Sequence, residues 1–137
     1  MFMFERCLYF NSNALVRRIN KKWEQAYEKT GLSPAHAYLI RLLLDKGELS
    51  QKQVAEELQL EKSTVTRFVT ALEGKGLLQR EKIGREQIIR PTVTAKKMKQ
   101  QLNRIGDELY QQLQQELGVA ELKQMVSRVK SVGKKLG

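Results

Sequence analysis

Apolar residues along this chain recur mostly at spacings of three and four, which is the period of a helix with one buried face. This pattern predicts a long first helix over about residues 4–30, with Gly31 as its stop. A second helix follows Ser33, whose hydroxyl can cap it, and carries Pro34 at its first position, where a missing N–H costs nothing. Because the second helix is apolar almost all round, we expect it to be buried.

Two more amphipathic helices are expected at the other end of the chain. The first begins at a capping Thr94 and runs to about Leu117, and the second runs from about Val119 to Leu136 after a break at Gly118. Together with the helix at residues 4–30, they present more apolar surface than a small domain can cover. We therefore expect a helical layer that pairs two subunits; the alternative is that these stripes close the core of a monomer.

Residues 49–78 predict two short helices joined by a tight turn, with the second running into a strand. The first helix opens at Ser50, whose hydroxyl forms a capping box with Gln53. The second begins near residue 62, and its end is marked by two glycines, Gly74 and Gly76. Its apolar positions follow the pattern i, i+3, i+4 and i+7, and so share one stripe: Val65, Phe68, Val69 and Leu72.

The opposite side of this second helix carries short hydroxyl side chains and one guanidinium: Ser63, Thr66, Arg67 and Thr70, with Thr64 at its flank. Small hydroxyls let a helix approach base edges closely, and Arg67 can bind guanine O6 and N7 with two hydrogen bonds. The pattern therefore indicates a recognition helix for the major groove of DNA. The alternative is an ordinary solvated helix face, since any surface helix is polar outside.

Two β-prone runs, residues 77–82 and 87–93, flank a turn at Ile83-Gly84-Arg85-Glu86 and predict a β-hairpin. Leu49 is expected to add a one-residue bridge, and Pro91 restricts the second run to an edge or a strand end. The hairpin is basic, with Arg80, Lys82, Arg85 and Arg90. A basic loop of this kind suits a phosphate backbone or a minor groove.

Composition narrows the class of partner. The chain has 137 residues and a formal net charge of +10, an excess that favours nucleic acid over an anionic membrane surface, the alternative being a basic but inert surface. No apolar run approaches the roughly 20 residues of a membrane-spanning helix, so no membrane partner is expected. A single cysteine excludes an internal disulfide and fits the reducing cytoplasm.

Three pieces of the sequence, in this order, resemble the winged helix-turn-helix of the MarR (multiple antibiotic resistance regulator) family: LSQKQVAEEL, EKSTVTRFVTALEGKGLLQR and TVTAKK. The resemblance implies an α+β, mainly α fold, with a DNA-binding part at about 33–94 and helical dimerisation parts at about 4–30 and 95–137. It also implies a homodimeric, sequence-specific transcriptional regulator, with repression the expected mode. Its partner would be a pseudo-palindromic operator in double-stranded DNA. A small-molecule or oxidative signal would release the protein from this operator.

Base contacts are then expected from Ser63, Thr64, Thr66 and Arg67, with Thr70 at the margin. Phosphate or minor-groove contacts are expected from Lys62, Lys75, Arg80, Lys82, Arg85 and Arg90. One departure from the family concerns the wing, which usually carries Asp-x-Arg just after its tip. The corresponding positions here are Arg85 and Gln87, and the wing is about one residue shorter, so Arg85 is expected to substitute from the tip.

The sequence suggests two mechanisms by which a signal would release the protein from its operator. Cys7 resembles the N-terminal reactive cysteine of the peroxide-sensing branch of the family, and a sensing thiol must be partly exposed and readily ionised, which Arg6 and a helix N-terminus would favour. The alternative for Cys7 is an inert, small hydrophobic side chain in the dimer layer. The second route is a small aromatic or lipophilic inducer in a crevice between the helical layer and the wing domain, for which no residue identifies the ligand.

Enzyme motifs are scarce, and no catalysis, metal or cofactor is expected. His36, the single histidine, has no metal-ligand spacing to Cys7, and the phosphate-loop pattern is absent. Two other classes remain as alternatives: a protein-interaction or architectural winged-helix module without sequence-specific DNA contacts, and an RNA-binding protein. The outer face of residues 60–70 is neither acidic nor apolar, which disfavours the first, and it lacks the aromatic platform that single strands need.

Overall fold

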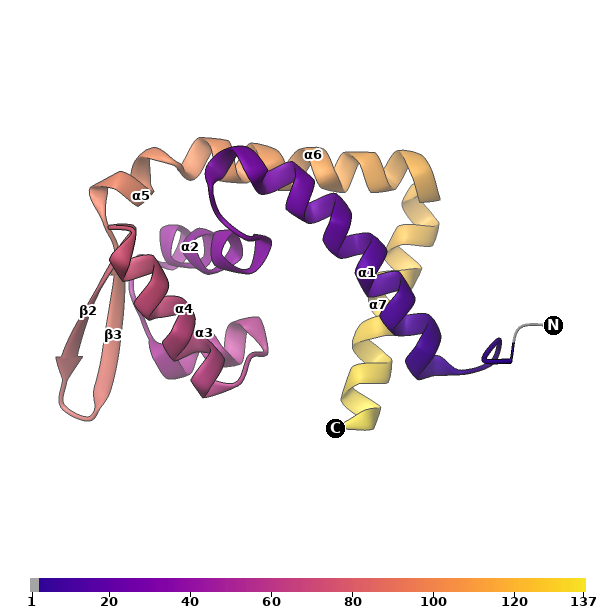
Figure 1. Ribbon diagram of the computed structural model, residues 1–137, viewed down its shortest axis with the longest axis horizontal. Coiled ribbons are helices and arrows are strands. Elements are labelled where there is room, and N and C mark those ends of the chain that lie inside the picture. The colour runs from indigo at the N-terminus through magenta and orange to yellow at the C-terminus, as the bar shows by residue number, and fades with distance from the viewer. Residues whose placement is uncertain (1–2) are drawn as a thin grey trace. The chain divides into compact units, whose positions relative to one another are not determined.

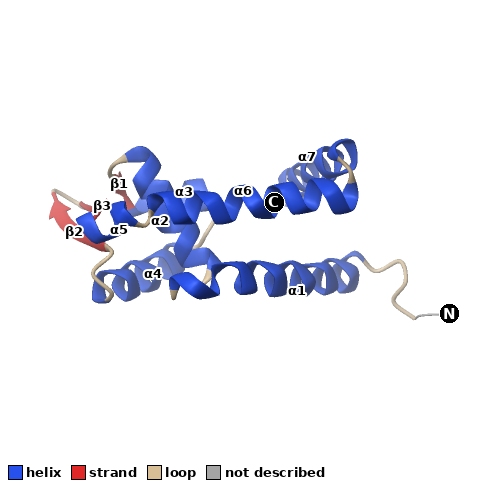
Figure 2. Cartoon of the chain, turned by 90° about the horizontal axis from the view of Figure 1, so that it is seen from above, coloured by secondary structure: helices blue, strands red, loops and turns tan. Residues whose placement is uncertain are grey.

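The computed structural model describes residues 3–137, which are mainly helical and include one small antiparallel sheet (Figures 1 and 2). The chain forms two compact units, divided between Asn103 and Arg104. The predicted division near residue 94, between DNA-binding and helical parts, concerns function and stays a prediction. No helix in the described part is long and apolar enough to cross a membrane.

The first unit begins with α1 (Leu8–Tyr27), which continues into a 3-10 turn at Glu28–Thr30. The predicted start at residue 4 is wrong, because Cys7 caps the helix and the Asn11 side-chain amide binds the Phe4, Glu5 and Cys7 carbonyls at 2.8–3.2 Å. This amide holds the preceding residues in turns outside the helix. Gly31, at φ +74°, takes the left-handed conformation that ends the segment, as predicted.

Helix α2 (Pro34–Lys46) starts where the sequence predicts, with Ser33 Oγ accepting from His36 N at 3.2 Å. Its buried side chains lie in the core: Ala37, Leu39, Ile40 and Leu43. The expectation that α2 is buried all round is wrong at Tyr38, which is 36% exposed. Tyr38 lies at the surface, where its hydroxyl accepts from Trp23 Nε1 at 3.1 Å and its ring packs beside Arg41.

The helix-turn-helix follows as β1 (Leu49–Ser50), α3 (Gln51–Leu58) and α4 (Lys62–Gly74). The predicted capping box is confirmed, because Ser50 Oγ accepts from Gln53 N at 3.1 Å and Gln53 Oε1 accepts from Ser50 N at 2.9 Å. Gln59 turns the chain between the helices at φ 54°. Helix α4 contains Gly74, so of the two predicted stop residues it is Gly76, at φ +74°, that reverses the chain.

Strands β2 (Leu78–Ile83) and β3 (Glu86–Pro91) form the predicted hairpin. Its turn is tighter than predicted, since Ile83 pairs with Glu86 and only Gly84 and Arg85 lie between them. The sheet order is β1-β3-β2, and Leu49 pairs with Ile89 as predicted, but Ser50 also pairs with Ile88, so the predicted one-residue bridge is a two-residue strand (red strands in Figure 2). Pro91 ends β3, where a missing N–H is tolerated.

The predicted helix from Thr94 to Leu117 is in fact two helices, α5 (Val93–Lys97) and α6 (Lys99–Leu117), separated at Met98. The predicted cap is also displaced. Thr92, rather than Thr94, accepts from Ala95 N at 3.2 Å, while its hydroxyl donates to Gly76 O at 2.7 Å. Thr92 therefore links the start of α5 to the turn that follows α4. Its hydrogen bond to Gly76 O favours Thr92 over Thr94 as the cap.

The second unit contains the remainder of α6 and α7 (Val119–Leu136), separated by Gly118 at φ +89°, as predicted. Leu109 and Leu122 are buried. Much of the apolar stripe of α7 remains exposed in the single chain: Met125, Val126, Val129, Val132 and Leu136.

Candidate nucleic-acid interface

Helix α4 is fixed to the first unit by its apolar stripe, as the sequence predicts. Val65, Val69 and Leu72 are fully buried. Phe68 lies at the edge of the stripe, half-buried, with its ring 4.7 Å from the His36 ring in an edge-on arrangement. Because one face is held in the core, the other face has a defined orientation toward solvent.

That other face carries the side chains predicted to contact bases. Ser63, Thr66, Arg67 and Thr70 are exposed, and Thr64 is half-buried at the flank. The structure brings these five residues together on one exposed side of α4, at the edge of the first unit. Short polar side chains projecting from an accessible helix have the geometry required to enter a major groove.

The hydroxyl groups of this face are held by further side chains. Arg67 Nη2 donates to Thr64 Oγ1 at 3.3 Å, one turn back along the helix. Arg80, on β2, donates to Thr70 Oγ1 at 3.1 Å and forms an ion pair with Glu73 at 3.3 Å. The guanidinium groups are therefore positioned before any partner is bound, which reduces the entropy that binding must overcome.

Gln51, the first residue of α3, also belongs to this face, and sequence reasoning missed it. Its Nε2 donates to Thr66 Oγ1 at 3.3 Å, and the Thr66 hydroxyl donates to Lys62 O at 3.0 Å. Among the described residues, Gln51 Oε1 is the single buried side-chain polar atom that lacks a hydrogen-bond partner. The periodicity of either helix gives no signal for this contact, because it depends on how α3 and α4 cross.

The cations of the wing fall into two groups. Arg90 is paired within the chain, with Nε 2.5 Å from Glu48 Oε2 and Nη1 2.7 Å from Glu81 Oε2. The hydrogen bond that Arg90 donates to Glu81, followed by the one that it donates to Glu48, raises the pKa of Arg90. In contrast, no ion pair within residues 3–137 involves Lys82 or Arg85, and both are exposed.

The two remaining lysines predicted to contact DNA flank α4. Lys62, at its first position, is exposed and forms no ion pair within residues 3–137. Lys75, at its C-cap, donates from Nζ to Gly31 O at 3.0 Å. Lys75 and burial also affect His36, whose pKa is lowered chiefly by desolvation and then by the neighbouring ammonium. His36 is therefore neutral at pH 7.

Cys7, the predicted redox residue, lies at the N-cap of α1 and is half-buried. Its Sγ accepts a hydrogen bond from Phe10 N at 3.5 Å. The position is compatible with the predicted sensing role, which stays a prediction.

An aromatic cluster joins α1, α2 and the start of α6 within the first unit. Arg41 Nη1 donates to the buried Tyr27 hydroxyl at 3.4 Å, and Arg41 Nε donates to Asn103 Oδ1 at 3.2 Å. Trp23 Nε1 donates to the Tyr38 hydroxyl at 3.1 Å. Burial, with a further contribution from Tyr38, raises the pKa of Tyr27 to about 12. Tyr27 therefore stays a neutral hydrogen-bonding group at physiological pH.

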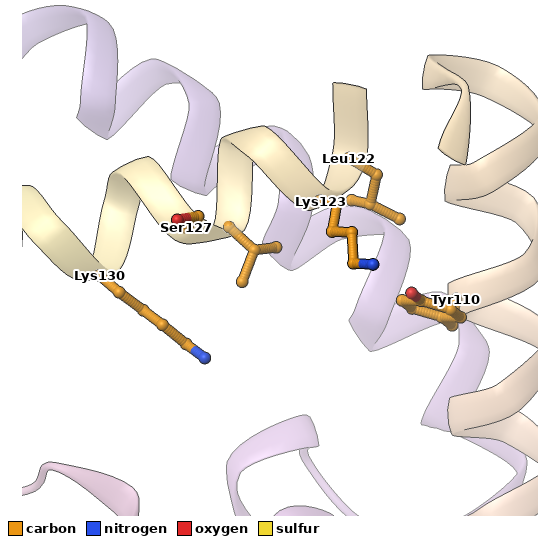
Figure 3. A pocket seen from close by; sticks show the side chains of 6 residues that line it. Tyr110, Leu122, Lys123, Ser127 and Lys130 are labelled. Atoms are coloured by element: carbon orange, nitrogen blue, oxygen red, sulfur yellow. The ribbon is translucent and has the colours of Figure 1, made fainter. Parts of the chain in front are cut away.

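The second unit carries a hollow of about 280 Å³ between α6 and α7 (Figure 3). Leu122 and Val126 supply its apolar lining, Lys123 of α7 lies near Tyr110 of α6, and Lys130 projects from α7 farther along the helix. Its polar lining side chains are exposed to solvent. Within the described residues, no three His, Cys, Asp or Glu side chains are grouped in a way that could hold a metal ion.

Comparison with known proteins supports the winged-helix interpretation. The MarR family model matches residues 32–85, which include α2, β1, α3, α4 and the first strand of the hairpin, β2. The HTH-type transcriptional repressor MdtR of Bacillus subtilis (strain 168) is 31% identical over 67 residues. That segment covers 49% of this chain and 43% of the repressor, so less than half of that relative is matched.

Solved structures extend the likeness to nearly the whole chain. MepR of S. aureus, in a crystal structure with DNA, superimposes with a TM-score of 0.81 at 22% identity, covering 93% of this chain and 97% of MepR. Bordetella bronchiseptica BpsR, described for the regulation of its DNA binding by 6-hydroxynicotinic acid, gives a TM-score of 0.84 at 17% identity, covering 96% and 98%. At these identities the structures show the winged helix-turn-helix fold, and in sequence the chain is similar to the MarR family over residues 32–85.

Proposed function

We propose that this protein is a sequence-specific, DNA-binding transcriptional regulator that acts as a repressor. The observation that carries the proposal is the exposed face of α4, where hydroxyl and guanidinium groups are held in place by side chains from α3 and β2. A merely solvated face has no need of such fixed side chains, whereas recognition of base edges depends on them. MepR, whose structure contains DNA, and MdtR, a transcriptional repressor, add support from related proteins.

In this proposal α4 enters the major groove, with Ser63, Thr64, Thr66 and Arg67 at the bases and Thr70 at the margin. Lys62, Lys82 and Arg85 contact phosphates or the minor groove, because no ion pair within residues 3–137 balances their charges. Arg80 and Lys75 keep their intramolecular bonds, and they contribute to DNA binding because their positive charges lie near the phosphates. Arg90, between two carboxylates, contributes least of the predicted cations.

We also propose that the protein is a homodimer on a pseudo-palindromic operator. The exposed apolar side chains of α1 and of α7 are more than a soluble monomer usually leaves uncovered: Leu8, Leu15, Val16 and Ile19 on α1, and Met125, Val126, Val129 and Val132 on α7. A second copy of the chain is the occupant that covers both helices in a two-fold arrangement. Two recognition helices then fit successive major grooves about 34 Å apart.

Release by a small aromatic or lipophilic molecule is supported by the aromatic cluster of α1 and α2, where the partly exposed Tyr38 ring and the Arg41 guanidinium offer both stacking and charge. BpsR, whose DNA binding responds to 6-hydroxynicotinic acid, shows such control in a protein of this fold. In the oxidative alternative, the Cys7 thiolate attacks a hydroperoxide, giving a sulfenic acid on Cys7 and releasing the corresponding alcohol.

The test is fluorescence anisotropy of the purified protein with duplex DNA from upstream of its own coding sequence and with random duplex of equal length, across a range of salt concentrations. We expect selective binding by a dimer that persists above about 100 mM salt. Equal, salt-sensitive binding to both duplexes would favour an architectural protein instead, and no binding to either would favour a protein-interaction module. Organic hydroperoxide added to the wild type and to Cys7→Ser then separates the two routes of release.

A further inference from the structure

The contact between Gln51 and Thr66 determines which hydrogen bonds the recognition helix can make. Thr66 Oγ1 has one proton and two lone pairs. The proton is donated to Lys62 O at 3.0 Å, and one lone pair accepts from Gln51 Nε2 at 3.3 Å. One lone pair therefore remains, and the exposed side of Thr66 acts as a hydrogen-bond acceptor.

Gln51 itself does not lie on the recognition helix. It is the first residue of α3, 15 positions earlier in the chain, and its side chain is half-buried between the two helices. Its Oε1 is closed off from solvent without a hydrogen-bond partner among the described residues. An acceptor left unpaired in this way opposes folding, so an amide at this position is better explained by function than by stability.

We propose that Gln51 is a positioning residue for sequence recognition, which acts by holding Thr66 as an acceptor for the exocyclic amino group of adenine or cytosine in the major groove. Adenine N6 and cytosine N4 are the donors that bases present there, while guanine O6 and thymine O4 are acceptors. The fixed Thr66 hydroxyl therefore accepts a hydrogen bond from adenine N6 or cytosine N4, and it forms none with guanine O6 or thymine O4. This inference rests on the proposed function, because it requires α4 to contact bases.

The experiment starts with selection of binding sites from a randomised duplex library by the full-length wild type. The preferred site is then used in anisotropy titrations with each single base-pair substitution. The same two measurements are made for Gln51→Met, which keeps the length of the side chain and removes the amide, and for Gln51→Ala. At one base-pair position in each half-site, preference for the amino base should fall by about 3- to 10-fold, as expected for one hydrogen bond. The preferences at the other positions should be unchanged.

Gln53→Ala provides the matched control. Gln53 lies on the same helix and completes the capping box with Ser50, with no bond to α4. Its loss should weaken binding to every duplex equally and lower the melting temperature, without changing the preference at any single position. A Gln51 variant that behaves in the same way has only a structural role, and the proposal is then wrong.

Thr66→Val tests whether Gln51 acts through Thr66. In the Thr66→Val background, Gln51→Met should cause no further change in base preference. A further change at the same position would show that Gln51 contacts the base directly and would overturn the positioning role. If the wild type selects no sequence at all, the proposed function fails first. If the wild type selects a sequence, and Gln51→Met and Gln51→Ala show the same base preferences as the wild type, the positioning role alone fails.

Discussion

Helices α4 and α7 carry apolar stripes of the same period, yet in the single chain the stripe of α4 is buried and most of the stripe of α7 is exposed. On α4, Val65, Val69 and Leu72 are fully buried, whereas on α7, Val129 is 58% exposed and its neighbours in the stripe are also exposed. The difference shows that periodicity predicts a helix and its apolar face but does not identify the partner that covers this face. For α4 the partner is the chain itself; for α7 we propose a second copy.

The largest expected effect lies on the buried side of this comparison. Leu72→Ala should lower the free energy of unfolding by about 2–5 kcal/mol, because it leaves a cavity in a fully packed site. Urea denaturation monitored by circular dichroism measures the change. Val93→Ala is the control, since Val93 is 68% exposed and its truncation should change stability by less than about 0.5 kcal/mol. Equal effects of the two substitutions would contradict the burial described for α4.

On the exposed side, Val129→Asp should leave the fold intact and separate the proposed dimer, because a charge would be placed in an apolar interface. Light scattering after size-exclusion chromatography measures the mass in solution. Operator affinity should fall by at least about tenfold, or about 1.4 kcal/mol, once two half-sites are no longer bound together. Ser131→Asp adds the same charge outside the stripe and should remain a dimer. A Val129→Asp protein that stays dimeric would exclude α7 from the interface.

The polar face of α4 is tested by Arg67→Ala. Because Arg67 is held by Thr64 and faces solvent, we expect it to discriminate between base pairs, so that its loss reduces the preference for operator over random DNA by about 1–3 kcal/mol. Anisotropy titrations with both duplexes provide the measurement. If affinity for the two duplexes falls equally, Arg67 contacts phosphate instead.

The wing permits a comparison between one unpaired and one paired cation. Lys82→Ala should weaken binding to all duplexes and reduce the slope of log affinity against log salt by about 1. Arg90→Ala should change this slope less, since Glu48 and Glu81 already balance its charge. Titrations at four or more salt concentrations distinguish the variants, and identical slopes for the two would show that Arg90 leaves its carboxylates to bind DNA.

The smallest expected effect concerns His36, which packs on Phe68 at the edge of the buried stripe. The pKa of His36 is lowered from its usual value of 6.5, so below that value the unfolded chain binds a proton more readily than the folded protein does. The contribution of this group to stability is therefore present above about pH 6.5 and is lost as the pH falls toward the lowered pKa. Melting temperatures between pH 5 and 8 should show a smaller acid decline for His36→Gln than for the wild type.

Much of the fold could be predicted from local rules, because the relevant physics is local. Ser33, Ser50 and Gly31 act on the backbone within a few residues, and their predicted roles are confirmed. The cap at Thr92 was missed because its advantage depends on a bond to Gly76 O, 16 residues away. For the same reason the pairing of Arg90 with Glu48, and of Gln51 with Thr66, could not be predicted: each depends on how separate elements meet.

The recognition helix is held near both ends by bonds to distant parts of the chain. Thr66, in its first turns, is bonded to Gln51, and Lys75, at its C-cap, is bonded to the carbonyl oxygen of Gly31. Together with the buried stripe of Val65, Val69 and Leu72, these two bonds limit the freedom of α4 to rotate about its own axis. The second bond joins α4 to the connection between α1 and α2, so the orientation of the recognition helix depends on that connection as well as on the core.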